Sequence, residues 1–174
     1  GNTSKRYAQA FFEAMPFHAL TVAPYMGHDS LQPFFNYPNR WLVVLGLTSN
    51  PGAEDFQLQA LADGKGQFLY ERVMEKVASW APLDQVMFVV GATRPEQLAA
   101  IRQQYPDHFF LVPGVGAQGG DLESVMQFGQ ARAGGGLLIN SSRGIIYRSR
   151  TPDFAASAAL AAEELQSQMA PLLR

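Results

Sequence analysis

The residues best suited to chemistry form a glycine-rich stretch, Val112-Pro-Gly-Val-Gly-Ala-Gln-Gly-Gly-Asp121. It comes where the pattern predicts that a strand ends and a helix begins, and backbone amides and the helix dipole attract anions at such a position. Four glycines let the backbone approach a ligand closely and leave the loop free to close, and Gln118 adds a neutral donor. The stretch therefore predicts an anion-binding loop, with an ordinary tight turn as the alternative.

A second polar stretch, Asn140-Ser-Ser-Arg-Gly-Ile-Ile-Tyr147, follows the next predicted strand. Arg143 carries a planar, permanently charged group that fits a phosphate, and Ser141 and Ser142 add hydroxyl and backbone donors. Taken alone, Arg143 is equally well explained as a surface arginine. Because loops after the last two strands form a recurrent phosphate site in barrel enzymes, the two stretches together predict phosphate binding. Neither one matches a P-loop or a dinucleotide-binding motif.

A third stretch, Leu47-Thr-Ser-Asn-Pro-Gly-Ala-Glu-Asp-Phe56, places two hydroxyls at the end of a buried strand. Thr48 or Ser49 could donate a hydrogen bond to a polar ring there, and helix capping is the alternative explanation. The three histidines are scattered and match no metal-binding motif, so we predict no metal site. None of the three lysines lies at the end of a strand, so the sequence offers no obvious proton donor.

Composition limits the class of protein. The 174 residues are 47% apolar and carry a net charge of −2, which is typical of a folded domain rather than a disordered chain. A pI of about 5.9 argues against a general nucleic-acid surface or a polybasic membrane surface. No apolar run is long enough to span a membrane, and the lack of cysteine excludes disulfides and thiolate chemistry.

The elements that must position these residues alternate between strand and helix in a single predicted domain, residues 1–174. We expect strands at 19–23, 41–47, 86–90, 109–112 and 136–139, and helices at 4–15, 68–80, 93–105, 122–128 and 153–173, with a possible turn at 28–35. Ser4, Thr93 and Asp121 are the expected helix caps. Two α/β architectures fit: a five-stranded doubly wound sheet, or part of a (β/α)8 barrel. Length alone favours the first, because a complete barrel takes about 250 residues.

The three stretches, with Val22-Ala-Pro-Tyr-Met-Gly-His-Asp and Val90-Gly-Ala-Thr, resemble the orotidine 5′-phosphate decarboxylases over essentially the whole chain, most closely their longer microbial branch. The resemblance implies a (β/α)8 TIM barrel, of which this chain supplies roughly strands four to eight. It also implies a cytoplasmic homodimer with shared active sites that converts orotidine 5′-monophosphate (OMP) to UMP and carbon dioxide in pyrimidine biosynthesis. The family uses no cofactor or metal, and no nucleic acid or membrane partner is expected.

The resemblance also assigns roles to particular residues. Gln118 and Arg143 would hold the substrate's phosphate, with help from the Ser142 backbone, and the loop 113–121 would close over it. Ser49, with Thr48 as the second choice, would hydrogen-bond the pyrimidine. Two further positions complete the expected binding set: Val115 would line the base pocket, and Thr3 would reach the neighbouring subunit's site.

One family feature is absent from the sequence. The charged catalytic array includes a D-x-K-x-x-D segment at the end of the third strand, and this chain contains no such segment. The missing lysine would protonate C6 of the pyrimidine, so we expect the chain alone to be inactive, with the first three barrel units upstream of Gly1. Two alternatives remain: another barrel enzyme acting on a phosphorylated sugar or nucleotide, and a non-catalytic, flavodoxin-like phosphate-binding module.

Overall fold

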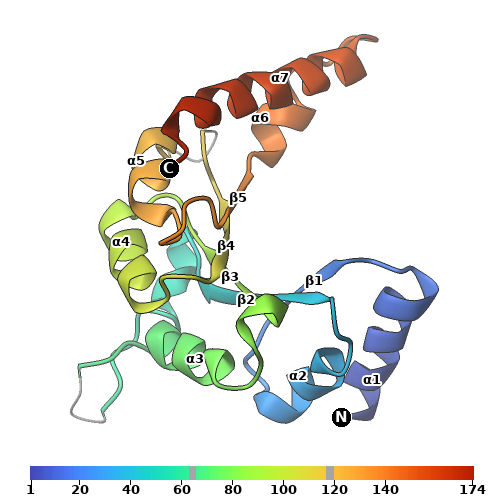
Figure 1. Ribbon diagram of the computed structural model, residues 1–174, viewed down its shortest axis with the longest axis vertical. Coiled ribbons are helices and arrows are strands. Elements are labelled where there is room, and N and C mark those ends of the chain that lie inside the picture. The colour runs from blue at the N-terminus through green and yellow to red at the C-terminus, as the bar shows by residue number, and fades with distance from the viewer. Residues whose placement is uncertain (63–65, 117–119) are drawn as a thin grey trace. The chain divides into compact units, whose positions relative to one another are not determined.

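The computed structural model describes residues 1–62, 66–116 and 120–174, and shows alternating strands and helices (Figure 1). The strands are β1 Ala19–Val22, β2 Trp41–Leu47, β3 Val86–Val90, β4 Phe109–Pro113 and β5 Leu137–Asn140. The α-helices are α1 Asn2–Gln9, α2 His28–Phe35, α3 Leu69–Ala78, α4 Pro95–Gln104, α5 Leu122–Gly129, α6 Ser142–Ile146 and α7 Phe154–Met169. Short 3-10 helices cover Pro51–Glu54, Leu83–Gln85 and Ala170–Leu172, and α1 continues as a π-helix over Ala10–Ala14.

The strands follow one another in the sheet in chain order, from β1 to β5. β1 runs parallel to β2, with Ala19 opposite Trp41, and β4 runs parallel to β5, with Phe110 opposite Leu137. A flavodoxin-like sheet would place the second strand at its edge, in the order 2-1-3-4-5. The flavodoxin-like alternative is therefore wrong, and a sequential parallel order is what successive units of a barrel produce.

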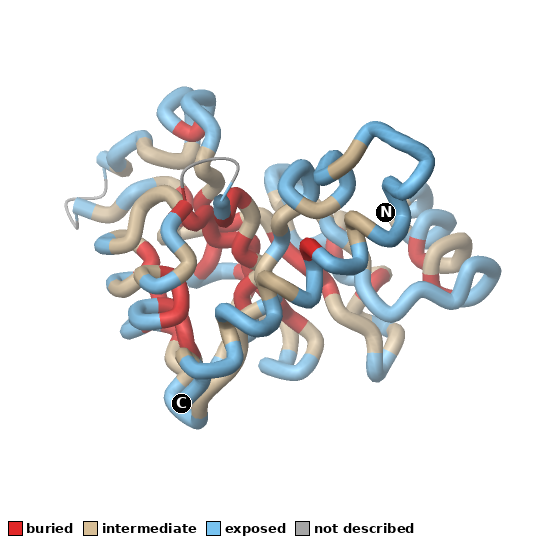
Figure 2. Tube along the Cα trace, turned by 90° about the horizontal axis from the view of Figure 1, so that it is seen from above, coloured by how far each residue is buried: buried red, intermediate tan, exposed pale blue. Residues whose placement is uncertain are grey.

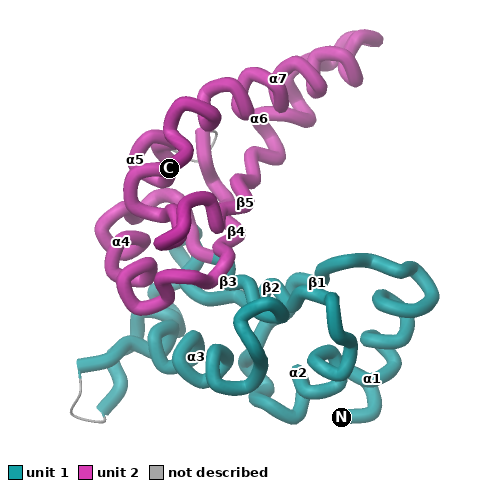
Figure 3. Tube along the Cα trace, viewed as in Figure 1, with its two compact units in different colours: residues 1–89 teal, residues 90–174 magenta. Residues whose placement is uncertain are grey.

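The chain divides into two compact units, Gly1–Val89 and Val90–Arg174 (Figure 3). In the first unit α1 packs on α2 and α3 packs on β2, and in the second α4 packs on α5 and α6 on α7. That residues 1–174 form a single domain stays a prediction.

The prediction that residues 41–47 form a buried strand is confirmed by β2, and β3 is buried as well. β3 is buried along its whole length, and β2 has only two half-buried positions (Figure 2). Gly46 of β2 is required sterically, because a Cβ atom there would lie 3.0 Å from the Met74 sulfur of α3 and from the Val89 carbonyl oxygen. By contrast, β1 and β5 alternate between half-buried and exposed residues, so neither is covered on both faces.

A buried arginine holds the second unit together at the ends of its elements. Arg102 of α4 is 7% exposed, and its guanidinium lies 3.7 Å from the centre of the Phe110 ring. It donates hydrogen bonds to four backbone carbonyls, those of Tyr105, His108, Gly129 and Gly136, at 2.7 to 3.3 Å. Burial lowers the pKa of Arg102 to about 10, so the group remains charged at neutral pH.

The first residues of α1, α4 and α5 test the three helix caps that the sequence predicted. Asp121 is confirmed, because its carboxylate accepts a 2.8 Å hydrogen bond from the Ser124 N–H at the start of α5. Ser4 is wrong, since α1 already begins at Asn2. Thr93 is wrong as well: α4 begins at Pro95, and Arg94 takes the cap position. Pro95 fits the first turn because it has no N–H to leave unpaired.

Candidate functional site

Backbone hydrogen bonds join the two described ends of the glycine-rich stretch, residues 114–116 and Gly120. The Gly120 N–H donates to the Gly114 carbonyl at 3.1 Å, and the Gly116 N–H donates to the Gly120 carbonyl at 2.9 Å. Val115 and Gly120 form a bridge between them. We call these four residues the loop neck. Gln118 lies outside the described residues, so its predicted role in binding phosphate stays a prediction.

The glycines of the loop neck are required by backbone geometry. Gly114 and Gly116 have φ angles of 96° and 76°, which side chains other than glycine rarely adopt. A Cβ atom on Gly120 would lie 2.5 Å from the Ala92 Cβ and 2.7 Å from the Gly114 carbonyl oxygen. The glycine content of this stretch therefore builds a tight, hydrogen-bonded structure at the end of β4.

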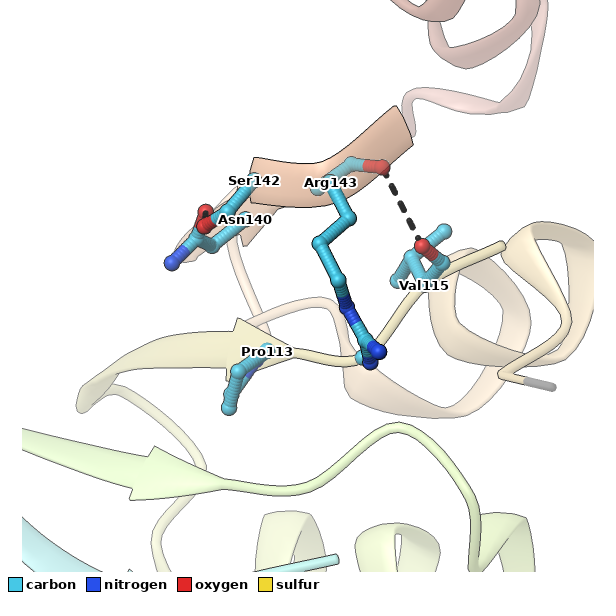
Figure 4. Close-up of a pocket in the computed structure, with 7 residues that line it drawn as sticks. Pro113, Val115, Asn140, Ser142 and Arg143 are labelled. Carbon is cyan, nitrogen blue, oxygen red and sulfur yellow. Dashed lines mark hydrogen bonds between the residues drawn. The ribbon is translucent and has the colours of Figure 1, made fainter. Parts of the chain in front are cut away.

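The loop neck and the turn after β5 enclose a cavity of about 60 Å³, lined by residues 113–115 and 140–143 (Figure 4). This is the shared space that the two predicted phosphate loops were expected to form. Since a water molecule takes about 30 Å³ of liquid, the cavity has room for a group of a few heavy atoms. Val115 is 3% exposed and lines this cavity together with Ser142 and Arg143.

Arg143 is exposed and available to an anion. Its side chain extends from the start of α6 toward the segment that follows β4 (Figure 4). Among the described residues, no carboxylate lies within 4.0 Å of its guanidinium, whereas Arg148 pairs with Glu164 at 3.2 Å. The positive charge of Arg143 is thus not neutralised by a described carboxylate.

Three polar residues beside Arg143 form two hydrogen bonds. The Ser142 hydroxyl donates to the Asn140 side-chain oxygen at 3.0 Å, which leaves the Ser142 backbone as its remaining donor toward a ligand. The Ser141 hydroxyl donates to the Val115 carbonyl at 3.2 Å. From the sequence, Ser141 and Ser142 were both expected as donors, the family resemblance added a role for the Ser142 backbone alone, and Asn140 was given no role. The proximity of Ser141 and Asn140 to Arg143 in the stretch 140–147 was the sequence feature that could have pointed to them.

Thr48 and Ser49 follow β2 in the first unit and differ in their bonding. The Thr48 hydroxyl lies 2.6 Å from the Asn50 side-chain oxygen and accepts a 2.9 Å hydrogen bond from the Gln57 amide, and the Thr48 N–H donates to Gln57 at 2.8 Å. The Ser49 hydroxyl oxygen is buried and has no hydrogen-bond partner among the residues that the structure describes. Of the two candidates, Ser49 therefore has the free hydroxyl.

The other predicted features are less informative. Thr3 lies exposed in the first turn of α1, in the first unit. Over residues 1–62, 66–116 and 120–174, no three histidine or acidic side chains gather closely enough to hold a metal ion. In the same ranges, no helix has the length and apolar character needed to cross a bilayer.

Comparison with known proteins decides the family. Residues 1–159 match the model of the orotidine 5'-phosphate decarboxylase / HUMPS family. The chain belongs to this family. The resemblance inferred from the five sequence stretches is thereby confirmed, and it extends from α1 into α7.

Relatives named orotidine 5'-phosphate decarboxylase match the whole chain. The relative from Bacteroides fragilis is 51% identical over 174 residues, which is all of this chain and 62% of the relative. Among solved structures, Leishmania donovani OMP decarboxylase is similar with a TM-score of 0.79 and 40% identity, over 96% of this chain and 63% of that one. Leishmania donovani UMP synthase has a TM-score of 0.80 and 43% identity, over 95% and 36%. The chain thus spans less than two thirds of the length of these proteins.

Proposed function

We propose that this chain supplies the phosphate-binding and pyrimidine-binding part of an orotidine 5′-phosphate decarboxylase. The observation that carries the proposal is the small cavity where the loop neck meets Arg143, whose charge no described carboxylate neutralises. Arg143, Gln118 and the Ser142 backbone would bind the 5′-phosphate of OMP. In parallel α/β folds, ligands bind at the carboxyl ends of strands, and β4 and β5 end at this cavity.

The pyrimidine contact is assigned to Ser49 rather than Thr48. A buried hydroxyl without a partner loses its hydrogen bonds to water, so it has the most to gain from a polar ligand atom. The Thr48 hydroxyl already bonds Gln57, so its role is to hold the loop that follows β2. Val115 would border the base, and Thr3 would reach the site of a second subunit in a homodimer.

The residues of this chain would act by binding and not by proton transfer. Loss of carbon dioxide leaves the electron pair on C6 of the pyrimidine, and a proton must then be delivered to that carbon. The family's lysine for this step belongs to the D-x-K-x-x-D segment, which is absent from the sequence. Phosphate binding remote from C6 would supply energy that is used to reach the transition state. The proposed reaction uses no cofactor. The enzyme is expected in the cytoplasm.

The test compares two exposed arginines in the full-length protein that carries these residues. Arg143→Ala should raise KM and lower kcat/KM for OMP by about tenfold to 100-fold, because a charge-assisted hydrogen bond contributes about 1.5–3 kcal/mol. Arg150→Ala removes the same charge seven residues later and should change kcat/KM less than twofold. Binding of uridine, which has no phosphate, should be the same in both variants.

Three outcomes would contradict the proposal. Unchanged kinetics in both Arg143→Ala and Gln118→Ala would exclude the phosphate site. Turnover or binding of ribulose phosphates in place of OMP would favour a different barrel enzyme. Decarboxylation by the 174-residue chain alone would show that its own residues include a proton donor.

A further inference from the structure

Ser141 joins the two loops of the phosphate cavity. It lies between β5 and α6, and its hydroxyl donates to the carbonyl of Val115 in the loop neck, 26 residues earlier in the chain. The dashed line in Figure 4 marks this hydrogen bond beside Arg143. The contact therefore connects the segment that carries Arg143 to the segment that faces it.

Helix capping, the usual role of a serine at this position, does not explain the direction of the Ser141 hydroxyl. Ser141 is the N-cap residue of α6, and an N-cap serine normally accepts a hydrogen bond from an N–H in the first turn. In α6 the Ser141 side chain makes no such bond. Its hydroxyl is directed to the other loop instead, so capping is not its function.

Gly144 provides the space that this orientation needs. A Cβ atom on Gly144 would lie 2.7 Å from the Ser141 hydroxyl oxygen, which is the contact that it would make with a described residue beyond its chain neighbours and the backbone of α6. The φ angle of Gly144 is outside the left-handed region, so its backbone does not require glycine. Glycine is a poor helix former, and alanine would be preferred at this position in α6. The steric contact with Ser141 is the reason that the structure gives for glycine here.

We infer that Ser141 is a positioning residue that sets the separation between the loop neck and Arg143, and that Gly144 keeps its hydroxyl in place. This inference rests on the proposed function, since it concerns the same phosphate cavity. Ser141 acts through Val115 and needs no contact with the substrate. Without the hydrogen bond from Ser141, the Val115 carbonyl is no longer held in place. The two loops must then be ordered when the phosphate binds, and this entropy cost lowers the affinity.

The experiment is a double-mutant cycle in the full-length protein, with UMP and uridine as probes. Ser141→Ala and Gly144→Ala should each weaken UMP binding about three- to tenfold, because each removes the same hydrogen bond. The double variant should bind UMP as each single variant does, since an alanine at 144 meets no hydroxyl once Ser141 is gone. Uridine affinity should change much less than UMP affinity in all three variants, because uridine has no phosphate, and KM for OMP should rise more than kcat falls.

A matched control and a second measurement distinguish a failure of the positioning role from a failure of the proposed function and from loss of the fold. Ser79→Ala removes a hydroxyl that donates to the Lys76 carbonyl and should leave UMP binding unchanged. Additive effects in the double variant, or equal weakening of uridine and UMP, would overturn the inference, and circular dichroism would exclude loss of fold as the cause. If Arg143→Ala weakens UMP binding while Ser141→Ala and Gly144→Ala do not, the positioning role fails and the phosphate site stands. If Arg143→Ala also has no effect, the proposed function itself fails.

Discussion

The buried Ser49 hydroxyl has no hydrogen-bond partner among the described residues, so one substitution should change stability and activity in opposite directions. Burying a hydroxyl without a hydrogen bond costs about 1–3 kcal/mol, and Ser49→Ala removes only that oxygen. We therefore expect the free energy of unfolding to rise by about 1 kcal/mol, after allowing for the small cavity left behind. If the hydroxyl donates to the pyrimidine, kcat/KM should fall about three- to tenfold, which is the effect of one hydrogen bond between neutral groups.

Thr48→Val is the matched comparison, because it removes the neighbouring hydroxyl and keeps the branched shape. The Gln57 amide would lose its 2.9 Å hydrogen bond to Thr48, while the bond from the Thr48 N–H to Gln57 would remain. The expected result is the reverse of the first: a loss of about 1 kcal/mol of stability and less than a twofold change in kcat/KM.

Both quantities are measured on the same full-length preparations. Urea unfolding gives the free energy, and the steady-state rate of OMP decarboxylation gives kcat/KM. Ser49→Ala that is destabilised by 1 kcal/mol or more and retains wild-type kcat/KM would refute the assignment, since the hydroxyl would then be structural. A tenfold activity loss confined to Thr48→Val would move the pyrimidine contact to Thr48.

Three further predictions concern the scaffold of the second unit. Gly120→Ala places a methyl group against the Ala92 Cβ and the Gly114 carbonyl, so it should cost about 1–3 kcal/mol of stability in urea unfolding; wild-type stability would mean that the loop neck is not tightly packed. Arg102→Met removes the side-chain donor to four backbone carbonyls, of which that of Gly136 keeps the Phe110 N–H, and should cost about 3 kcal/mol. Arg132→Met, at an arginine with a 3.9 Å ion pair to Asp107, should cost less than 1 kcal/mol. Hydrogen bonds at Ser124 hold the pKa of Asp121 below its ordinary value, so its charge stabilises the fold above that ordinary value and the contribution is lost as pH falls through the lowered pKa. The stability difference between wild type and Asp121→Asn should therefore disappear in acid, and a difference that persisted at pH 2 would contradict the assignment.

Features that depend on short stretches of sequence could be predicted. The unbroken apolar run of β2 indicated a buried strand, and Asp121 lies directly before the first turn that it caps. Ser4 and Thr93 failed because other residues occupied the cap: α1 extends two residues further toward the N-terminus, and Pro95 set the start of α4. A helix boundary depends on which of several adjacent residues adopts the non-helical backbone, and residue type only biases that choice.

The candidate site was predictable in outline for a related reason. Parallel strands that neighbour each other end at the same edge, so the stretches after β4 and β5 had to meet. The roles of individual hydroxyls were not predictable, because their partners come from distant residues. Thr48 is occupied by Gln57, nine residues later, and Ser141 bonds Val115, 26 residues earlier. Residue type alone does not separate Thr48 from Ser49 or Ser141 from Ser142.

The structure of the loop neck changes how the glycine-rich stretch is interpreted. Four glycines suggested a loop with freedom to close, and a flexible loop would pay a large entropy cost when a ligand ordered it. In the structure, Gly114, Gly116 and Gly120 are held by hydrogen bonds to one another, and each occupies a position where a side chain would be strained or would clash. These three glycines therefore make the end of β4 more ordered, and they lower the entropy cost of binding at the cavity. Arg143 would then meet a preformed surface when the proposed phosphate site is filled, so less entropy would be lost on binding.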